Sequence, residues 1–189
     1  MDTETKLTNV GEDYFLNGEK LTRVTEVMVS AGLVSTDFFT EEGKIRGSAV
    51  HLACDFLIRK NLDWDSVHEK CFGYVKAAEK FLSSEIFLPI AELCDVRDFH
   101  PQYLYTGKPD WFGVLNGYHA IVEIKTGDSK TANLQTAAYA EMPLFKKYNP
   151  KRYVLELKKD GKFKLSKCES VNDFAIFIKC LFECKKILT

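Results

Sequence analysis

The sequence predicts five helices, and in three of them, residues 46–60, 65–83 and 171–188, the apolar residues recur at helical spacing. Within residues 65–83, Cys71, Val75 and Ala78 fall on one face of a helix, because positions three or four apart lie on the same side. Residues 129–148 are rich in alanine, which favours a helix, and Pro143 should kink or divide this helix. The predicted helices are residues 22–31, 46–60, 65–83, 129–148 and 171–188.

Strand-forming residues dominate the middle of the chain. Two runs, residues 103–116 and 118–127, meet at Asn116 and Gly117, and an Asn-Gly pair between such runs is a strong signal for a two-residue hairpin turn. Three further segments are predicted as strands. Residues 13–17 form a short hairpin or an extended start before Gly18, and residues 151–168 form a hairpin that turns at Asp160-Gly161. Residues 86–99 are strand-like, and Pro89 places them at a sheet edge or marks a break.

The elements follow one another roughly as α-α-β-β-β-α-β-β-α. This order predicts the α/β (α+β) class, with a central mixed β-sheet flanked by helices. The 189 residues, 46% of them hydrophobic, suffice for one buried core, so we expect a single domain over residues 1–189.

Three charges interrupt the central hairpin. Glu123 and Lys125 are two apart on one predicted strand and point to the same face, while the turn places Asp110 on the neighbouring strand near Glu123. Two adjacent carboxylates repel each other unless a cation lies between them, and Mg²⁺ prefers carboxylate oxygens. The Ile124 carbonyl would be a natural further ligand. A solvated ladder of surface ion pairs is the alternative interpretation.

Composition narrows the function. A net charge of −1 excludes a globally basic protein, so any phosphate contacts must come from a local patch. No apolar run approaches the roughly 18 residues of a membrane span, and the polar N-terminus carries no secretory signal, so we expect a cytoplasmic protein with no membrane contact. In the reducing cytoplasm we expect the six cysteines to be free thiols in the core. An iron–sulfur or zinc site that includes Cys168, Cys180 and Cys184 is the alternative.

The charged hairpin resembles the PD-(D/E)xK nuclease superfamily, in its RecB-type and phage exonuclease branch. The stretches "GKPDWFG", "VEIKTG" and "QTAAY" carry the likeness in the family's order. Asp110 follows a proline as in the family, Glu123 and Lys125 form the ExK element, and Gln135 and Tyr139 match its Q-x-x-x-Y helix. Upstream, "RGSAVH" is similar to the G-x-x-x-H helix, with Gly47 and His51, and "RVTEVM" is similar to a segment of related phage proteins. The likeness spans residues 21–165.

The resemblance implies a restriction-endonuclease-like core that binds Mg²⁺ or Mn²⁺. Asp110, Glu123 and the Ile124 carbonyl would hold the metal, with His51 approaching it. Lys125 would position or activate the attacking water and offset charge at the phosphate. Glu92 is similar in placement to an acidic residue that some members carry on the preceding strand. His51 could instead be a core histidine.

Five further residues are candidate substrate contacts. Gln135 and Tyr139, one helical turn apart, would line the site or form a helix hydrogen-bonding pair. Lys108 and Lys130 could contact phosphates or be solvated. Trp111 could stack on a base or belong to the core.

The function that follows from the resemblance is metal-dependent hydrolysis of DNA. An exonuclease of phage-type replication or recombination is favoured, acting in the cytoplasm of the host cell if the protein is phage-encoded. Its partners would be DNA and either further copies of the chain or a recombination protein. Two alternatives remain: a non-catalytic nucleic-acid-binding subunit that keeps the nuclease fold, and an enzyme that acts on a smaller phosphodiester.

Overall fold

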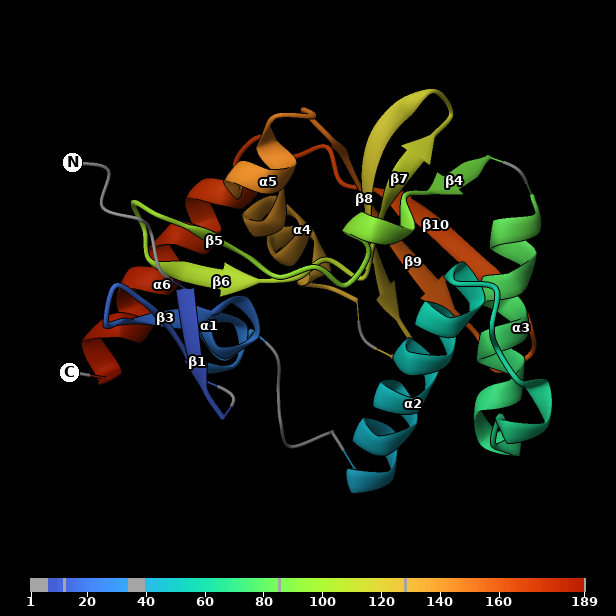
Figure 1. Cartoon of the computed structure of the whole chain (residues 1–189). Coiled ribbons are helices and arrows are strands. Elements are labelled where there is room, and N and C mark those ends of the chain that lie inside the picture. Colours follow the sequence, from blue (N-terminus) through green and yellow to red (C-terminus); the bar gives the residue numbers. More distant parts are fainter. Residues whose placement is uncertain (1–6, 12, 34–39, 85, 128, 189) are drawn as a thin grey trace.

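Two mixed five-stranded sheets, flanked by helices, make up the chain (Figure 1). The computed structural model describes residues 7–11, 13–33, 40–84, 86–127 and 129–188. The mixed α and β composition agrees with the sequence-based prediction. The prediction of one central sheet is wrong, because several strands of the second sheet are only three or four residues long and give little periodic signal.

The larger strands form a sheet in the order β10-β9-β8-β7-β4. Its members are β4 (Phe87–Pro89), β7 (Trp111–Leu115), β8 (Tyr118–Lys125), β9 (Lys151–Leu157) and β10 (Phe163–Lys167). β8 and β9 are parallel and the other neighbours are antiparallel. A parallel pair needs a crossover, and the helices between β8 and β9 supply it.

The predicted Asn-Gly hairpin is confirmed. Asn116 and Gly117 have φ angles of 49° and 80°, the left-handed values that a type I′ turn requires at both central positions. The turn fixes the register of β7 against β8, with Trp111 opposite Val122. One step further along this register sets Asp110 against Glu123.

The second sheet has the order β1-β2-β3-β6-β5. It contains β1 (Leu7–Val10), β2 (Asp13–Leu16), β3 (Glu19–Arg23), β5 (Asp98–His100) and β6 (Tyr105–Gly107). The predicted N-terminal hairpin is β2–β3, which turns at Asn17-Gly18. β3 then pairs in parallel with β6, so a segment near the N-terminus lies beside the stretch that leads to Asp110.

The helices are α1 (Val24–Ser30), α2 (Glu41–Ile58), α3 (Glu69–Ser83), α4 (Ala132–Glu141), α5 (Pro143–Lys146) and α6 (Asp173–Leu188). Pro143 divides the fourth predicted helix as expected and becomes the first residue of α5. Residues 86–99 are not one strand. β4 ends at Pro89, a short 3₁₀ helix spans Ala91–Leu93, and β5 begins at Asp98.

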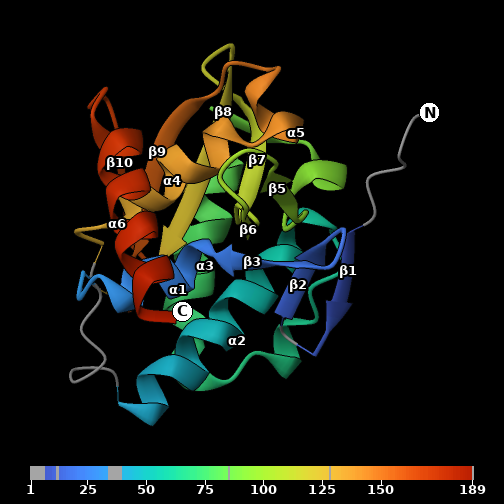
Figure 2. The same cartoon turned by 90° about the vertical axis from the view of Figure 1, so that its left-hand side faces the viewer.

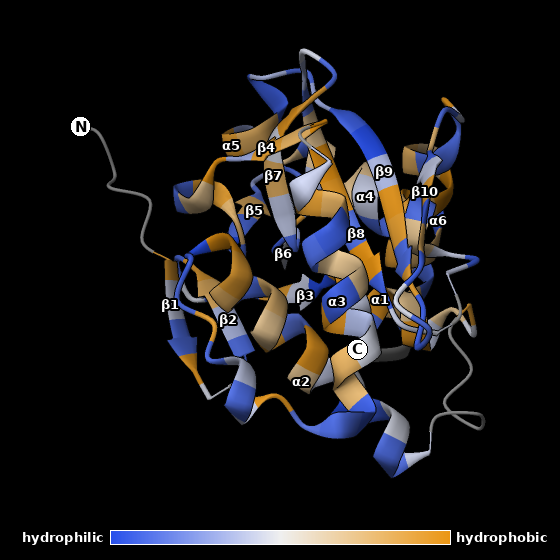
Figure 3. Cartoon of the chain, turned by 90° about the vertical axis from the view of Figure 1, so that its right-hand side faces the viewer, coloured by the Kyte–Doolittle hydropathy of each residue, from blue (hydrophilic) through white to orange (hydrophobic). Residues whose placement is uncertain are grey.

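The β7–β8 hairpin lies between two hydrophobic cores. Trp111, Val122 and Ile124 face α2 and α3, whereas Phe112 and Ile121 face α1, α4 and α6. This alternation follows from the two-residue period of a strand. Figure 2 shows α6 beside α4 and α1, on the side of the sheet that Phe112 and Ile121 face. Figure 3 shows that β9 is mostly hydrophobic after its polar first residues.

The cysteines contribute to these cores. All six are free thiols, and all but the half-buried Cys168 are buried, including Cys180 and Cys184 on α6. No helix in the described part of the chain has the length and apolar character to cross a membrane.

Candidate active site on the β7–β8 hairpin

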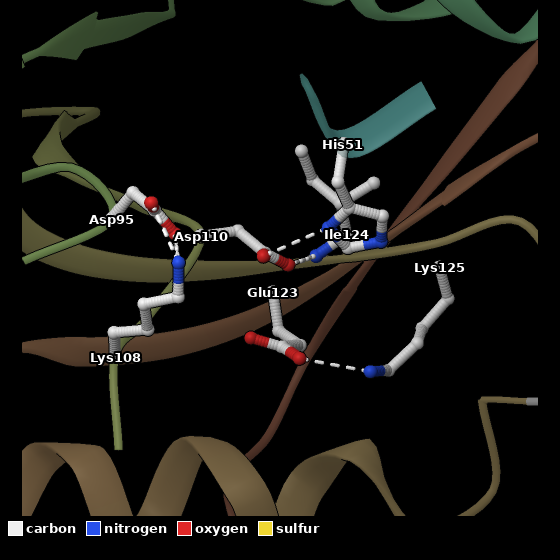
Figure 4. A network of polar contacts seen from close by, with 7 residues as sticks. All are labelled: His51, Asp95, Lys108, Asp110, Glu123, Ile124 and Lys125. Carbon is white, nitrogen blue, oxygen red and sulfur yellow. Dashed lines mark hydrogen bonds and ion pairs between the residues drawn. The ribbon is translucent and has the colours of Figure 1, made fainter. Parts of the chain in front are cut away.

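Asp110 is held by two contacts at the start of the hairpin. Its Oδ2 accepts a 2.7 Å hydrogen bond from the Ile124 amide, and its Oδ1 lies 2.9 Å from Nδ1 of His51 on α2 (Figure 4). Burial alone would raise the pKa of Asp110, but the charge and hydrogen bond of His51, the charge of Lys125 and the Ile124 amide hold it below its ordinary value. The carboxylate of Asp110 is therefore ionised and fixed in orientation.

Glu123 is the buried partner of Asp110. Only 4% of the residue is exposed, and its Oε2 atom has no hydrogen-bond partner within the described residues. Burial, followed by the neighbouring charge of Asp110, raises the pKa of Glu123 to about 7. A buried carboxylate oxygen without a partner is costly, so this oxygen marks a position suited to a positively charged ligand.

Lys125 neutralises one oxygen of Glu123. Its Nζ donates to Oε1 of Glu123 at 2.8 Å, which confirms that the two side chains share one face of β8. Burial would lower the pKa of Lys125, but the charges of Glu123 and Asp110 outweigh it and raise the value. The side chain stays an ammonium ion beside the two carboxylates.

Ionisation of a buried carboxyl group whose pKa is raised lowers the free energy of unfolding. Because Glu123 has a folded pKa of about 7 against an ordinary 4.5, the folded protein holds this proton more tightly than the unfolded chain. The stabilisation is complete below the unfolded pKa and is lost as pH rises through the folded value. In EDTA, we expect the free energy of unfolding to fall by on the order of 2–3 kcal/mol between about pH 5 and pH 8 from this group alone.

Glu123→Gln should remove most of this pH dependence, as measured by urea unfolding at the two pH values. Glu156→Gln on the adjacent strand is the matched control. The hydrogen bond from Lys158 lowers the pKa of Glu156, so this group titrates mainly below the tested window. Equal pH slopes for wild type and Glu123→Gln would show that Glu123 ionises as an ordinary surface carboxyl.

Gln135 and Tyr139 come to the site from α4. Both are buried and both border the same cavity as Glu123 and Lys125. Burial, then the charges of Glu123 and Asp110, holds the pKa of Tyr139 well above its ordinary value, so the phenol stays protonated. Gly107 allows this position of Tyr139, because a Cβ there would lie 2.6 Å from Tyr139 Cε1. The sequence-based placement of this pair beside the carboxylates agrees with the structure.

Two cavities open on either side of Asp110, and both include His51 and Lys108. The α4-side cavity, of about 310 Å³, is bordered further by Arg23, Arg97, Glu123, Lys125, Gln135 and Tyr139. The α2-side cavity, of about 470 Å³, is bordered further by Gly47, Ser48, Leu52, Asp55, Asp95 and Trp111. In Figure 4, Lys108 and Lys125 approach the Asp110–Glu123 pair from opposite sides.

Arg23 and Arg97 are site residues that the sequence analysis did not single out. β3 and β6 run parallel and end together, while β5 runs antiparallel to β6 and begins at the same edge. Arg23 at the end of β3, Arg97 before β5 and Lys108 after β6 therefore meet at one edge of the sheet. Arg23 opens the stretch "RVTEVM", which carried part of the resemblance, but no local signal marked Arg97.

Three predicted site residues are not placed for the substrate contacts expected of them. Trp111 is only 2% exposed and packs against Phe81 and Phe87, so it belongs to the core, and its burial argues against stacking on a base although it borders the α2-side cavity. Glu92 is exposed in the 3₁₀ helix rather than on a strand, and Lys130 is exposed before α4. Neither of these two borders the described cavities.

The residues present suit a magnesium-type ion better than a metal held by protein alone. In the described ranges, no three His, Cys, Asp or Glu side chains are grouped so as to hold a metal ion. Mg²⁺ commonly binds through one or two carboxylates and completes its shell with water and substrate phosphate oxygens. Asp110 and the partnerless Oε2 of Glu123 fit that need, and the Ile124 carbonyl as a ligand stays a prediction. His51 contacts Asp110, and its role as a ligand stays a prediction.

No protein-family model matches this chain, and no curated protein matches it significantly.

Proposed function

We propose that this protein is a Mg²⁺- or Mn²⁺-dependent deoxyribonuclease with a restriction-endonuclease-like core. One observation carries the proposal: the buried Asp110–Glu123 pair, with Lys125 on one Glu123 oxygen and no partner on the other, faces a cavity with a cationic edge. Lys125 pairs with only one oxygen of Glu123, so the second, buried oxygen still calls for a cation, and a magnesium-type ion there commonly binds substrate phosphate oxygens as well.

The cationic edge supports a phosphate-containing substrate. Arg23, Arg97, Lys108 and Lys125 border the α4-side cavity against two carboxylates. A local patch of this kind is the form of phosphate binding open to a chain of net charge −1. Guanidinium groups donate paired hydrogen bonds to phosphate oxygens, so Arg23 and Arg97 would position the strand.

Each residue of the centre then has a task. Asp110 and Glu123 would hold the ion, which when bound polarises the phosphate and makes water a better nucleophile. Lys125 keeps its proton beside Glu123 and offsets the negative charge that develops on the phosphate. His51 fixes the Asp110 carboxylate. Hydrolysis adds hydroxide from water to phosphorus, breaks one P–O bond, and leaves the proton on the departing oxygen.

A gel assay with linear and circular, single- and double-stranded DNA tests the proposal. Each DNA is incubated with Mg²⁺, Mn²⁺ or EDTA. We expect cleavage only with the divalent ions, and resistance of circular DNA if the enzyme attacks ends, as the resemblance to exonucleases suggests. Binding of DNA without cleavage under every condition would refute the nuclease proposal and favour a non-catalytic subunit of a recombination complex.

A further inference from the structure

The two cavities that meet at Asp110 differ in charge. The α4-side cavity is edged by Arg23 and Arg97, whereas the α2-side cavity carries Asp55 and Asp95. Asp55 is paired with Arg59, and Asp95 with Lys108. Both carboxylates keep oxygen lone pairs that can accept further hydrogen bonds, although their charges are offset by these cations. A phosphate group therefore fits the first cavity, and a group with N–H donors fits the second.

The α2-side cavity also has an apolar wall and open space. Leu52 of α2 is 58% exposed on this wall, although it is a large hydrophobic residue. A Cβ on Gly47, one turn and a residue earlier, would meet only Thr126 Oγ1 at 3.8 Å. Glycine is thus not needed for α2 to approach the hairpin. Its effect is to leave the cavity clear of a side chain.

We infer that the α2-side cavity receives an unpaired nucleobase from the nucleotide next to the cleaved phosphate; this inference rests on the proposed function. The cavity volume of about 470 Å³ lies within the roughly 300–1,000 Å³ of small-molecule sites. A base has an apolar face for Leu52, and its N–H groups can donate to carboxylates such as Asp95, as the cytosine amino group does in DNA recognition.

The two cavities are connected at Asp110, so one nucleotide can occupy both of them. Because both include His51, Lys108 and Asp110, a nucleotide whose phosphate lies at Asp110 can extend its base into the α2-side cavity. A base that is paired and stacked in a duplex cannot enter a cavity unless it leaves the stack. The protein should therefore act on single strands or on frayed ends.

Equilibrium binding tests the inference without cleavage. The probes are a fluorescent oligothymidylate and an abasic phosphodiester chain of the same length, titrated with the full chain in EDTA. Both probes carry the same charge, so the ratio of their dissociation constants reports the bases alone. For wild type we expect about tenfold weaker binding of the abasic chain, the scale of one base packed on protein.

Two variants test whether the α2-side cavity causes the difference in affinity between the two probes. Gly47→Val fills the cavity and Leu52→Ala removes its apolar wall, and each should reduce the ratio severalfold. Leu88→Ala is the matched control, since Leu88 is 61% exposed on β4 and borders neither cavity. It should keep the wild-type ratio. Thermal unfolding verifies that each variant is folded, and exposed Leu52 can be truncated with little effect on the fold.

A wild-type ratio near one would overturn the inference, as would an unchanged ratio in folded Gly47→Val and Leu52→Ala. Failure of the proposed function has a different signature. It appears as absence of metal-dependent cleavage by the wild type, whatever the binding ratio. A protein that cleaves DNA but shows no dependence on Gly47 and Leu52 refutes only the base site.

Discussion

Lys125→Ala should slow metal-dependent DNA cleavage by on the order of 10²-fold or more, while DNA affinity changes little. The ammonium group of Lys125 lies 2.8 Å from Glu123 and keeps its proton because two carboxylates surround it. Its charge would be needed most when negative charge builds up on the phosphate, so its loss should affect the chemical step more than binding.

The measurement is single-turnover cleavage of linear DNA under saturating protein, with binding measured separately in EDTA. Lys125→Met preserves the volume of the side chain and separates loss of charge from loss of packing. Lys151→Ala, an exposed lysine at the far end of the parallel neighbour β9, serves as the control and should retain wild-type rates. Near wild-type cleavage by Lys125→Met would contradict the assigned role.

The central hairpin was predictable because its signals are local. Asn116 and Gly117 accept the left-handed backbone of the turn, and the turn then fixes which residues of the two strands oppose each other. From this register, the proximity of Asp110, Glu123 and Lys125 follows without knowledge of the rest of the fold. The division of a helix at Pro143 is local in the same sense.

Contacts between distant segments were not predictable. Arg23 reaches the site only because β3 pairs with β6 across about eighty residues of sequence, and such short strands leave no clear periodic pattern. Arg97 depends on the same sheet. The second sheet itself, and the cationic edge it builds, were for this reason absent from the sequence-based prediction.

The sequence also left open the position of single residues that are suited both to the core and to a binding site. Trp111 directly follows Asp110 and could have faced either substrate or core, and only its packing against Phe81 and Phe87 decides for the core. Glu92 was expected on a strand, but Pro89 ends that strand and the chain turns outward. His51 shows the opposite outcome, since the α2 helix brings it to Asp110 from 59 residues away.

Asp110→Asn should abolish the stabilisation that Mn²⁺ gives the wild-type protein. A ligand present at about 100 times its dissociation constant stabilises the folded state by roughly 2.7 kcal/mol. For a chain of this size, each kcal/mol raises the melting temperature by about 2–4 °C, so Mn²⁺ should raise it by roughly 5–11 °C in the wild type. Asparagine keeps the shape of the side chain but loses the charge that would hold the ion, and cleavage should fall by on the order of 10²-fold or more with it.

The comparison is the melting temperature of each protein in EDTA and in excess Mn²⁺. Asp95→Asn is the matched control, because Asp95 is a nearby carboxylate that is paired with Lys108 and lies outside the Asp110–Glu123 pair. It should keep the full shift. Using the shift rather than the absolute melting temperature separates metal binding from the lost contact with His51, which would change both conditions alike. An undiminished shift in Asp110→Asn would place the metal elsewhere and remove the main support for hydrolysis at this hairpin.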